Sequence, residues 1–277
     1  MRIVITGMLL TACIFSAFAQ DIWMPQQKGS FISAEYFAPS LKENPYNIDI
    51  HTIVLSGAIE LNNGNRFKFD LPIVWYYQPA FTQTLFSGYT YTMPEEKSNG
   101  VGNFSFSYEI FRPGTNVSYE IGVRLPMASE TQPAPMMGAI ADYDRLEMYV
   151  PDYLTLNFLI NVRKEADNYF LIAHFGPSFL IRTGSSTTGN GLEMLLAGSV
   201  QGGIYIQNFS FSMGYSGRFD ASDNMDFADR FIHQIGAVAS LKVDKFQPNL
   251  FIRAPIDKNL EQALNFVYGI GLTYDLQ

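Results

Sequence analysis

The stretch NFSFSYEIFRPGTNVSYEIGVRLP, residues 103–126, carries two rows of side chains with opposite character. Aromatic and aliphatic side chains alternate with serine and glutamate up to residue 110, and the alternation resumes after the turn signal Arg112-Pro113-Gly114. Because successive side chains of a strand point to opposite faces, this alternation predicts two β-strands joined by a tight turn. One face of the pair is large and apolar, and the other is small, polar or charged.

The same alternation continues along the rest of the chain. We predict twelve strands, near residues 30–40, 52–61, 66–78, 103–111, 116–126, 153–163, 168–182, 192–207, 208–219, 230–243, 247–254 and 265–277. Most of these runs are about as long as the roughly 9–11 residues that a tilted strand needs to cross a membrane. Strands of soluble proteins typically have about 5–6 residues.

The connections between the predicted strands alternate strictly between long and short. The long ones are 41–51, 79–102, 127–152, 183–191, 220–229 and 255–264, and the short ones are 62–65, 112–115, 164–167, 207–208 and 244–246. This rhythm is typical of a transmembrane antiparallel up-and-down β-barrel with short periplasmic turns and long extracellular loops. Loops 79–102 and 127–152, the second with a helical turn near residues 136–148, are expected either to fold inward as a constriction or to cap the barrel.

Charge is confined to one of the two rows. From the second strand onward, the apolar row contains no Asp, Glu, Lys or Arg, and its one ionisable member is His233. Lipid excludes charge in this way, since a Lys or Arg facing hydrocarbon costs about 2–4 kcal/mol at mid-depth. We therefore predict that the apolar row faces lipid and that the other row faces a wet lumen. The residues predicted to line the lumen are Glu60, Lys68, Asp70, Glu109, Glu120, Arg124, Arg163, His174, Arg182, Arg218, Lys242 and Arg253.

The first 19 residues resemble a secretory signal peptide, with one positive charge, an apolar core and small residues before Gln20. A lipoprotein cleavage box at Leu10-Thr11-Ala12-Cys13 is the alternative. We expect cleavage after Ala19 and a single barrel domain over 20–277. That domain would hold no cysteine, which leaves no disulfide and no thiolate metal site.

Without Arg2, the 17 basic and 26 acidic residues give a net charge of −9, which argues against a nucleic-acid partner.

Candidate catalytic and metal-binding residues are few. An outer-membrane phospholipase would need a serine two residues after a histidine, and neither His51, His174 nor His233 has one. The clustered acids and Asp-His pair of an omptin-like protease are also missing, so we expect no enzyme activity and no cofactor. The aspartates at 220, 223, 226 and 229 could bind Ca²⁺, but their spacing matches no EF-hand, and a solvated external loop is the favoured interpretation.

Residues 100–126, GVGNFSFSYEIFRPGTNVSYEIGVRLP, resemble one family of barrels, the FadL-like proteins associated with the meta-cleavage pathway of phenol degradation. The shared features are a glycine-rich entry, an aromatic strand, a short turn and a strand that closes on Gly-x-x-Leu-Pro. The final GIGLTYDL is similar to the closing strand of such barrels. The resemblance implies an outer-membrane barrel that passes small, often hydrophobic molecules.

We therefore expect an outer-membrane channel or transporter of a Gram-negative envelope, for small solutes that include hydrophobic ones. Its expected partners are outer-membrane lipid, lipopolysaccharide, the barrel-assembly machinery and an unidentified solute. Two alternatives remain open. The barrel could be a non-conducting structural part of the envelope or of a secretion complex, or the chain could be a soluble secreted β-protein.

Overall fold

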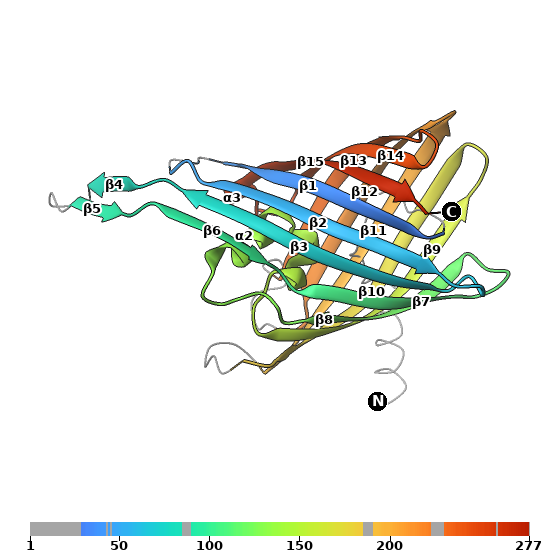
Figure 1. The fold of residues 1–277 in the computed structure, drawn as a ribbon, viewed down its shortest axis with the longest axis horizontal. Helices are drawn as coiled ribbons and strands as arrows, with labels where there is room; N and C mark the ends of the chain where they lie inside the picture. Colours follow the sequence, from blue (N-terminus) through green and yellow to red (C-terminus); the bar gives the residue numbers. More distant parts are fainter. Residues whose placement is uncertain are drawn as a thin grey trace, which may run out of the picture.

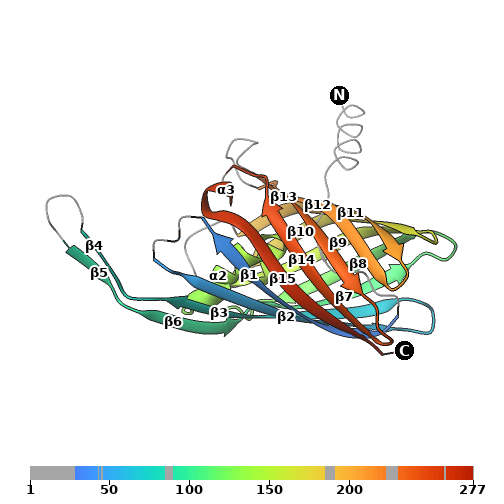
Figure 2. The same cartoon turned by 90° about the horizontal axis from the view of Figure 1, so that it is seen from above.

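The computed structural model describes residues 29–42, 44, 46–84, 90–184, 191–222, 230–258 and 260–276. Its main feature is a closed antiparallel β-barrel (Figure 1, Figure 2). The barrel strands are β1 (Phe31–Leu41), β2 (Asp49–Glu60), β3 (Arg66–Gln78), β7 (Phe104–Phe111), β8 (Val117–Leu125), β9 (Tyr153–Glu165), β10 (Tyr169–Arg182), β11 (Leu192–Ile206), β12 (Phe209–Asp220), β13 (Phe231–Leu241), β14 (Phe246–Pro255) and β15 (Leu264–Asp275).

Each barrel strand pairs with its neighbours in this order, and the first strand closes the cylinder on the last. β1 pairs with β2 on one side and with β15 on the other, so that Phe31 lies opposite both Ala58 and Asp275. Closure removes the free strand edges that an open sheet would expose. The predicted up-and-down barrel and its twelve strands are confirmed, with boundaries that differ by a few residues.

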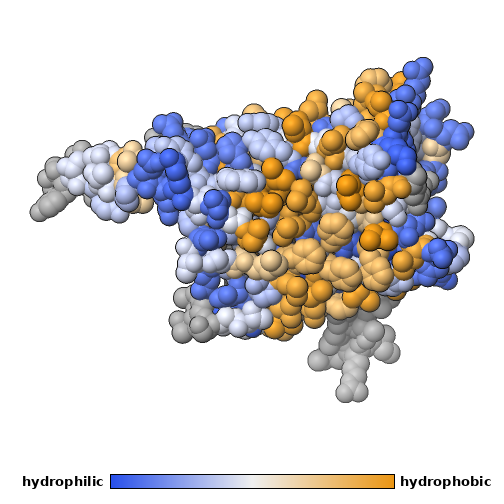
Figure 3. All heavy atoms as spheres, viewed as in Figure 1, coloured by the Kyte–Doolittle hydropathy of each residue, from blue (hydrophilic) through white to orange (hydrophobic). Residues whose placement is uncertain are grey.

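The two rows of the decisive stretch lie on opposite faces of the wall. Ser105, Ser107 and Glu109 are buried, whereas Phe106 and Ile110 on the same strand are exposed. Other strands repeat this pattern, and Figure 3 shows apolar side chains gathered over the body of the barrel. The predicted separation of the two faces is therefore present in the folded chain.

Residues 79–102 do not form the loop that the sequence predicts. They contain β4 (Phe81–Thr84), β5 (Thr90–Met93) and β6 (Glu96–Val101). β6 pairs with β3 from Ile73 to Gln78, beyond the point where β7 pairs with the first half of β3. The expectation of a constriction or a cap is wrong here, because the hairpin projects away from the barrel (Figure 1). The backbone groups of the long β3 strand need partners, and β6 supplies them.

In this antiparallel order, the short connections all lie at one end of the barrel, and the strand ends that lead into the long connections lie at the other. Gly64 and Gly114 have φ angles of 81° and 74° in two of the short turns, a conformation that favours glycine. The short helix α3 (Leu260–Ala263) lies in a long connection. No helix among the described residues has the length and apolar character needed to cross a bilayer.

Candidate functional site

Residues 126–152, which we call the plug, fold inward between β8 and β9. They contain the helix α2 (Pro133–Ala141) and the 3-10 helix η2 (Tyr143–Met148). Pro133 and Pro135 suit the first turn of α2, where backbone N–H groups have no partner within the helix. The helix ends at Asp142, whose N–H donates to the carbonyl oxygen of Gly138. Of the two placements expected for this loop, the structure has the inward one.

One side of the plug is apolar and contacts the inner wall. The plug contributes Ala134, Ala141, Tyr143, Met148 and Tyr149, and the wall contributes Phe37, Ile50, Val54, Val74, Tyr76, Val238, Phe251, Leu264 and Val267. The approach is close at Gly138, where a Cβ atom would lie 2.6 Å from the Tyr149 ring and 2.7 Å from a methyl group of Val74. A larger residue at 138 would therefore displace the plug.

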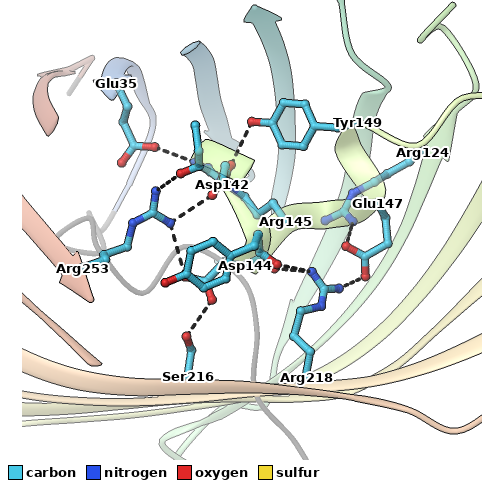
Figure 4. Close-up of polar contacts among 12 residues, drawn as sticks. Glu35, Arg124, Asp142, Asp144, Arg145, Glu147, Tyr149, Ser216, Arg218 and Arg253 are labelled. Carbon is cyan, nitrogen blue, oxygen red and sulfur yellow. Dashed lines mark hydrogen bonds and ion pairs between the residues drawn. The ribbon is translucent and has the colours of Figure 1, made fainter. Parts of the chain in front are cut away.

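The other side of the plug is ionic, and Glu147 is central to it. This side chain lies between two arginines of the wall (Figure 4). Arg124 on β8 donates to one carboxylate oxygen over 3.0 Å, and Arg218 on β12 donates to the other. All three side chains are at most 5% exposed, so solvent screens the ion pairs little.

Asp142 and Asp144 attach the plug to a third wall arginine. Arg253 on β14 donates to Asp142 over 3.0 Å and approaches Asp144 at 3.4 Å. Arg145 of the plug donates to Asp142 over 2.6 Å and to Glu35 of β1 over 3.2 Å. These groups and the Glu147 pairs make four buried acids and four buried bases, a balanced set, as burial of charge requires.

Asp142 stays ionised at neutral pH although it is buried. Burial alone would raise its pKa, but Arg145 and Arg253 outweigh that effect and hold the pKa of Asp142 below its ordinary value. The Tyr149 hydroxyl donates to the same carboxylate over 2.9 Å. Burial and the adjacent Asp142 anion raise the pKa of Tyr149 well above its ordinary value, so this hydroxyl remains a donor.

Asn103, the residue just before β7, holds both ends of the plug by hydrogen bonds. Its Nδ2 donates to the carbonyl oxygens of Glu147 and Val150, over 2.9 and 2.7 Å. Its Oδ1 accepts from the backbone N–H groups of Met127 and Ala128, both over 2.9 Å. The side chain is fully buried, so these bonds are shielded from competing water.

A second charged cluster lies nearer the short-turn end. Arg66 donates to Glu109 over 2.8 Å, and Lys68 donates to Glu120 over 2.8 Å. Asn161 on β9 donates to both carboxylates, over 3.1 and 3.3 Å. These pairs lie across β3, β7, β8 and β9 and balance one another in charge.

A cavity of about 400 Å³ adjoins this cluster and the turn 112–116. Arg66, Glu109, Ser118 and Asn161 are among its lining residues. His174 lies deeper on β10, where its Nδ1 is 2.7 Å from Asn161 Oδ1. The inner wall is therefore polar both at the cavity and around His174 and Asn161.

The structure places the predicted lumen residues in several environments. Glu109, Glu120, Arg124, His174, Arg218 and Arg253 are buried, while Glu60, Lys68, Asp70, Arg163 and Arg182 are partly buried. Arg163 pairs with Glu165, and the Arg182 guanidinium donates to the Tyr153 hydroxyl over 3.0 Å. Lys242 lies in the turn after β13 with its side chain 57% exposed, 3.8 Å from Asp275.

Sequence reasoning missed several members of these clusters. Glu35 is on the first strand, and the separation of charge predicted from the sequence begins only at the second strand. Asp142, Asp144, Arg145 and Glu147 fall in the loop, where period-two alternation gives no signal. The dense run of charge at DYDRLE, residues 142–147, was the available indication, although such a run is usually a solvated surface.

The described residues contain no group of three or more His, Cys, Asp or Glu side chains placed to hold a metal ion. Of the four clustered aspartates, only Asp220 is described, and it accepts from the Ser222 N–H over 2.8 Å. The other three aspartates, the segment 1–19 and Cys13 lie outside the described residues.

Comparison with solved structures identifies the architecture. An outer-membrane channel from Pseudomonas putida F1 matches 92% of this chain and 97% of its own, with a TM-score of 0.55 and 10% identity. The NanC porin matches 90% of this chain and 100% of its own, with a TM-score of 0.52 and 8% identity. No family model matches the sequence, and no curated protein does. At these identities the likeness concerns the fold, which this chain shares with outer-membrane channel barrels.

Proposed function

We propose that this protein is an outer-membrane β-barrel that acts as a channel for small solutes. The observation that carries the proposal is the inversion of polarity across a closed barrel, with large apolar side chains outside and charged ones inside. In water, exposing so many apolar side chains would be costly. In a bilayer, the same outer surface is favourable, and the charges are kept away from hydrocarbon.

The orientation follows from the connections. The short turns face the periplasm of a Gram-negative cell, and the long connections, with the β4–β5 hairpin, face outward. Residues 1–19 direct export and are then removed. The barrel-assembly machinery inserts the chain, and outer-membrane lipid and lipopolysaccharide surround it.

The inner wall favours water-soluble solutes. The charged and amide side chains around the cavity can form hydrogen bonds with a polar solute but offer little to an apolar one. The small hydrophobic molecules implied by the family resemblance would find the larger apolar area of the inner wall, on β1, β2, β3, β13, β14 and β15, covered by the plug. Their passage would therefore require the plug to move.

The plug also supports a second candidate, a non-conducting structural barrel of the envelope or of a secretion complex. Helices α2 and η2 occupy the interior, and buried ion pairs tie them to β1, β8, β12 and β14. A permanently attached plug would suit a barrel that passes no solute.

Planar-bilayer recording of the full chain and of Asn103→Ala separates these two functions. The variant removes four hydrogen bonds that fasten the plug, each worth about 0.5–1.5 kcal/mol. A channel should show single-channel steps, and the variant should show more frequent or larger ones. An intact variant barrel, verified by heat-modifiable electrophoretic mobility, that gives no steps would favour the structural role.

A simpler experiment excludes the third possibility, a soluble secreted protein. The barrel should remain with the outer membrane after a carbonate wash. Release into the soluble fraction would contradict the membrane proposal altogether.

A further inference from the structure

Three arginines of the inner wall converge on the plug from different strands. Arg124, Arg218 and Arg253 are each at most 4% exposed, and Figure 4 shows them pointing toward the carboxylates of the plug. The plug carbonyl groups orient two of them, because Arg218 donates to the Asp144 oxygen and Arg253 donates to the Ala141 oxygen over 3.0 Å. The wall thus supplies cations, and the plug supplies the matching anions.

The contact at Glu147 joins one carboxylate to two arginines. Each of its two oxygens accepts from a different guanidinium group, one from β8 and one from β12. Both donors are cationic and the acceptor is an anion, so both hydrogen bonds are charge-assisted and stronger than neutral ones. A carboxylate on a separate molecule could make the same contacts.

We propose that Arg124, Arg218 and Arg253 form the carboxylate-binding site of the lumen, and that Glu147, with Asp142 and Asp144, occupies it as an internal substitute for the solute. This inference rests on the proposed channel function and names its substrate class, small organic carboxylates. A solute carboxylate replaces the plug carboxylates at the arginines, and the exchange frees the plug from the wall.

The charge balance explains why an exchange is needed. With the plug acids removed, these wall positions keep three arginines against Glu35, and buried cations without counter-charges are strongly destabilising. While they remain buried, the arginines need a counter-charge, which either the plug or an incoming anion supplies. A neutral solute cannot take that role, so the same site excludes it.

Chemical rescue of Glu147→Ala tests the site. The substitution removes the carboxylate that bridges Arg124 and Arg218 and leaves room for a small anion. Sodium acetate should raise the melting temperature of the refolded variant, and the rise should grow with the logarithm of acetate concentration, as for a ligand that binds the native state. Sodium chloride at equal ionic strength and acetamide should not do so.

Two control variants locate the effect. Glu130→Ala removes an exposed carboxylate from the same segment, so acetate should leave its melting temperature unchanged. Adding Arg124→Gln to Glu147→Ala should abolish the rescue. If Glu147→Ala folds poorly, the folded yield in acetate against chloride replaces the melting temperature. No recovery in acetate, by either measure, overturns the site.

Bilayer recording of the same preparations distinguishes failure of the site from failure of the channel. Acetate rescue without single-channel steps would support the carboxylate-binding site and contradict the channel function. Single-channel steps without acetate rescue would support the channel function and contradict the carboxylate-binding site.

Discussion

Ile121→Arg tests whether hydrocarbon surrounds the barrel. Ile121 is the fifth of the nine residues of β8 and pairs with Tyr108 and Phe158. At a rise of about 3.4 Å per residue and a tilt of about 45°, it lies roughly 10 Å in depth from either end of the strand. That position is near the middle of an apolar band about 25 Å tall, where an arginine costs about 2–4 kcal/mol.

The matched control is Tyr91→Arg in β5, on the hairpin that projects beyond the barrel. Tyr91 is 54% exposed and Ile121 is 53% exposed, so a protein surrounded by water would tolerate both changes equally. In a bilayer, only Ile121→Arg should be costly, and Tyr91→Arg should stay within about 0.5 kcal/mol of the parent. Tyr119 is two residues nearer the short-turn end, so the free-energy cost of Tyr119→Arg should lie between the costs of the other two variants.

The assay is equilibrium unfolding in guanidinium chloride of the chain folded into lipid vesicles, followed by tryptophan fluorescence. A difference of at least about 2 kcal/mol between Ile121→Arg and Tyr91→Arg is expected. Equal free energies of unfolding for these two variants would refute the assignment of the apolar face to lipid.

Two further predictions concern the plug. Because the pKa of Asp142 is lowered in the folded state, its contribution to stability is present above the ordinary aspartate pKa near 4 and is lost as pH falls through the lower folded value. Melting temperatures measured from pH 7 to pH 2 should therefore converge for the parent and Asp142→Asn at the acid end, and parallel curves would contradict this. Gly102→Ala should cost about 1–3 kcal/mol, because its Cβ would lie 2.3 Å from the Met148 carbonyl oxygen. Gly191→Ala, whose Cβ would meet nothing within 4 Å, is its control in the unfolding assay. An equal loss of unfolding free energy in the two variants would show that the plug backbone shifts without cost and would contradict this prediction.

The sequence alone determined the wall of the barrel. Alternation with a period of two is local, since each strand residue points to the face opposite its neighbour, so Ser118 and Tyr119 could be assigned to opposite faces without coordinates. Hairpin connections are also local, which is why the alternation of long and short segments indicated an up-and-down barrel.

The contents of the barrel could not be predicted from the sequence. Which acid meets which base depends on distances across a closed cylinder, and no short sequence pattern encodes the approach of Arg253 on β14 to Asp142 in the plug. The same holds for β6, which is a strand because the far half of β3 offers it unpaired backbone groups. Charged residues in a long loop are usually solvated, and here closure of the barrel around them turned them into the buried contacts of the lumen.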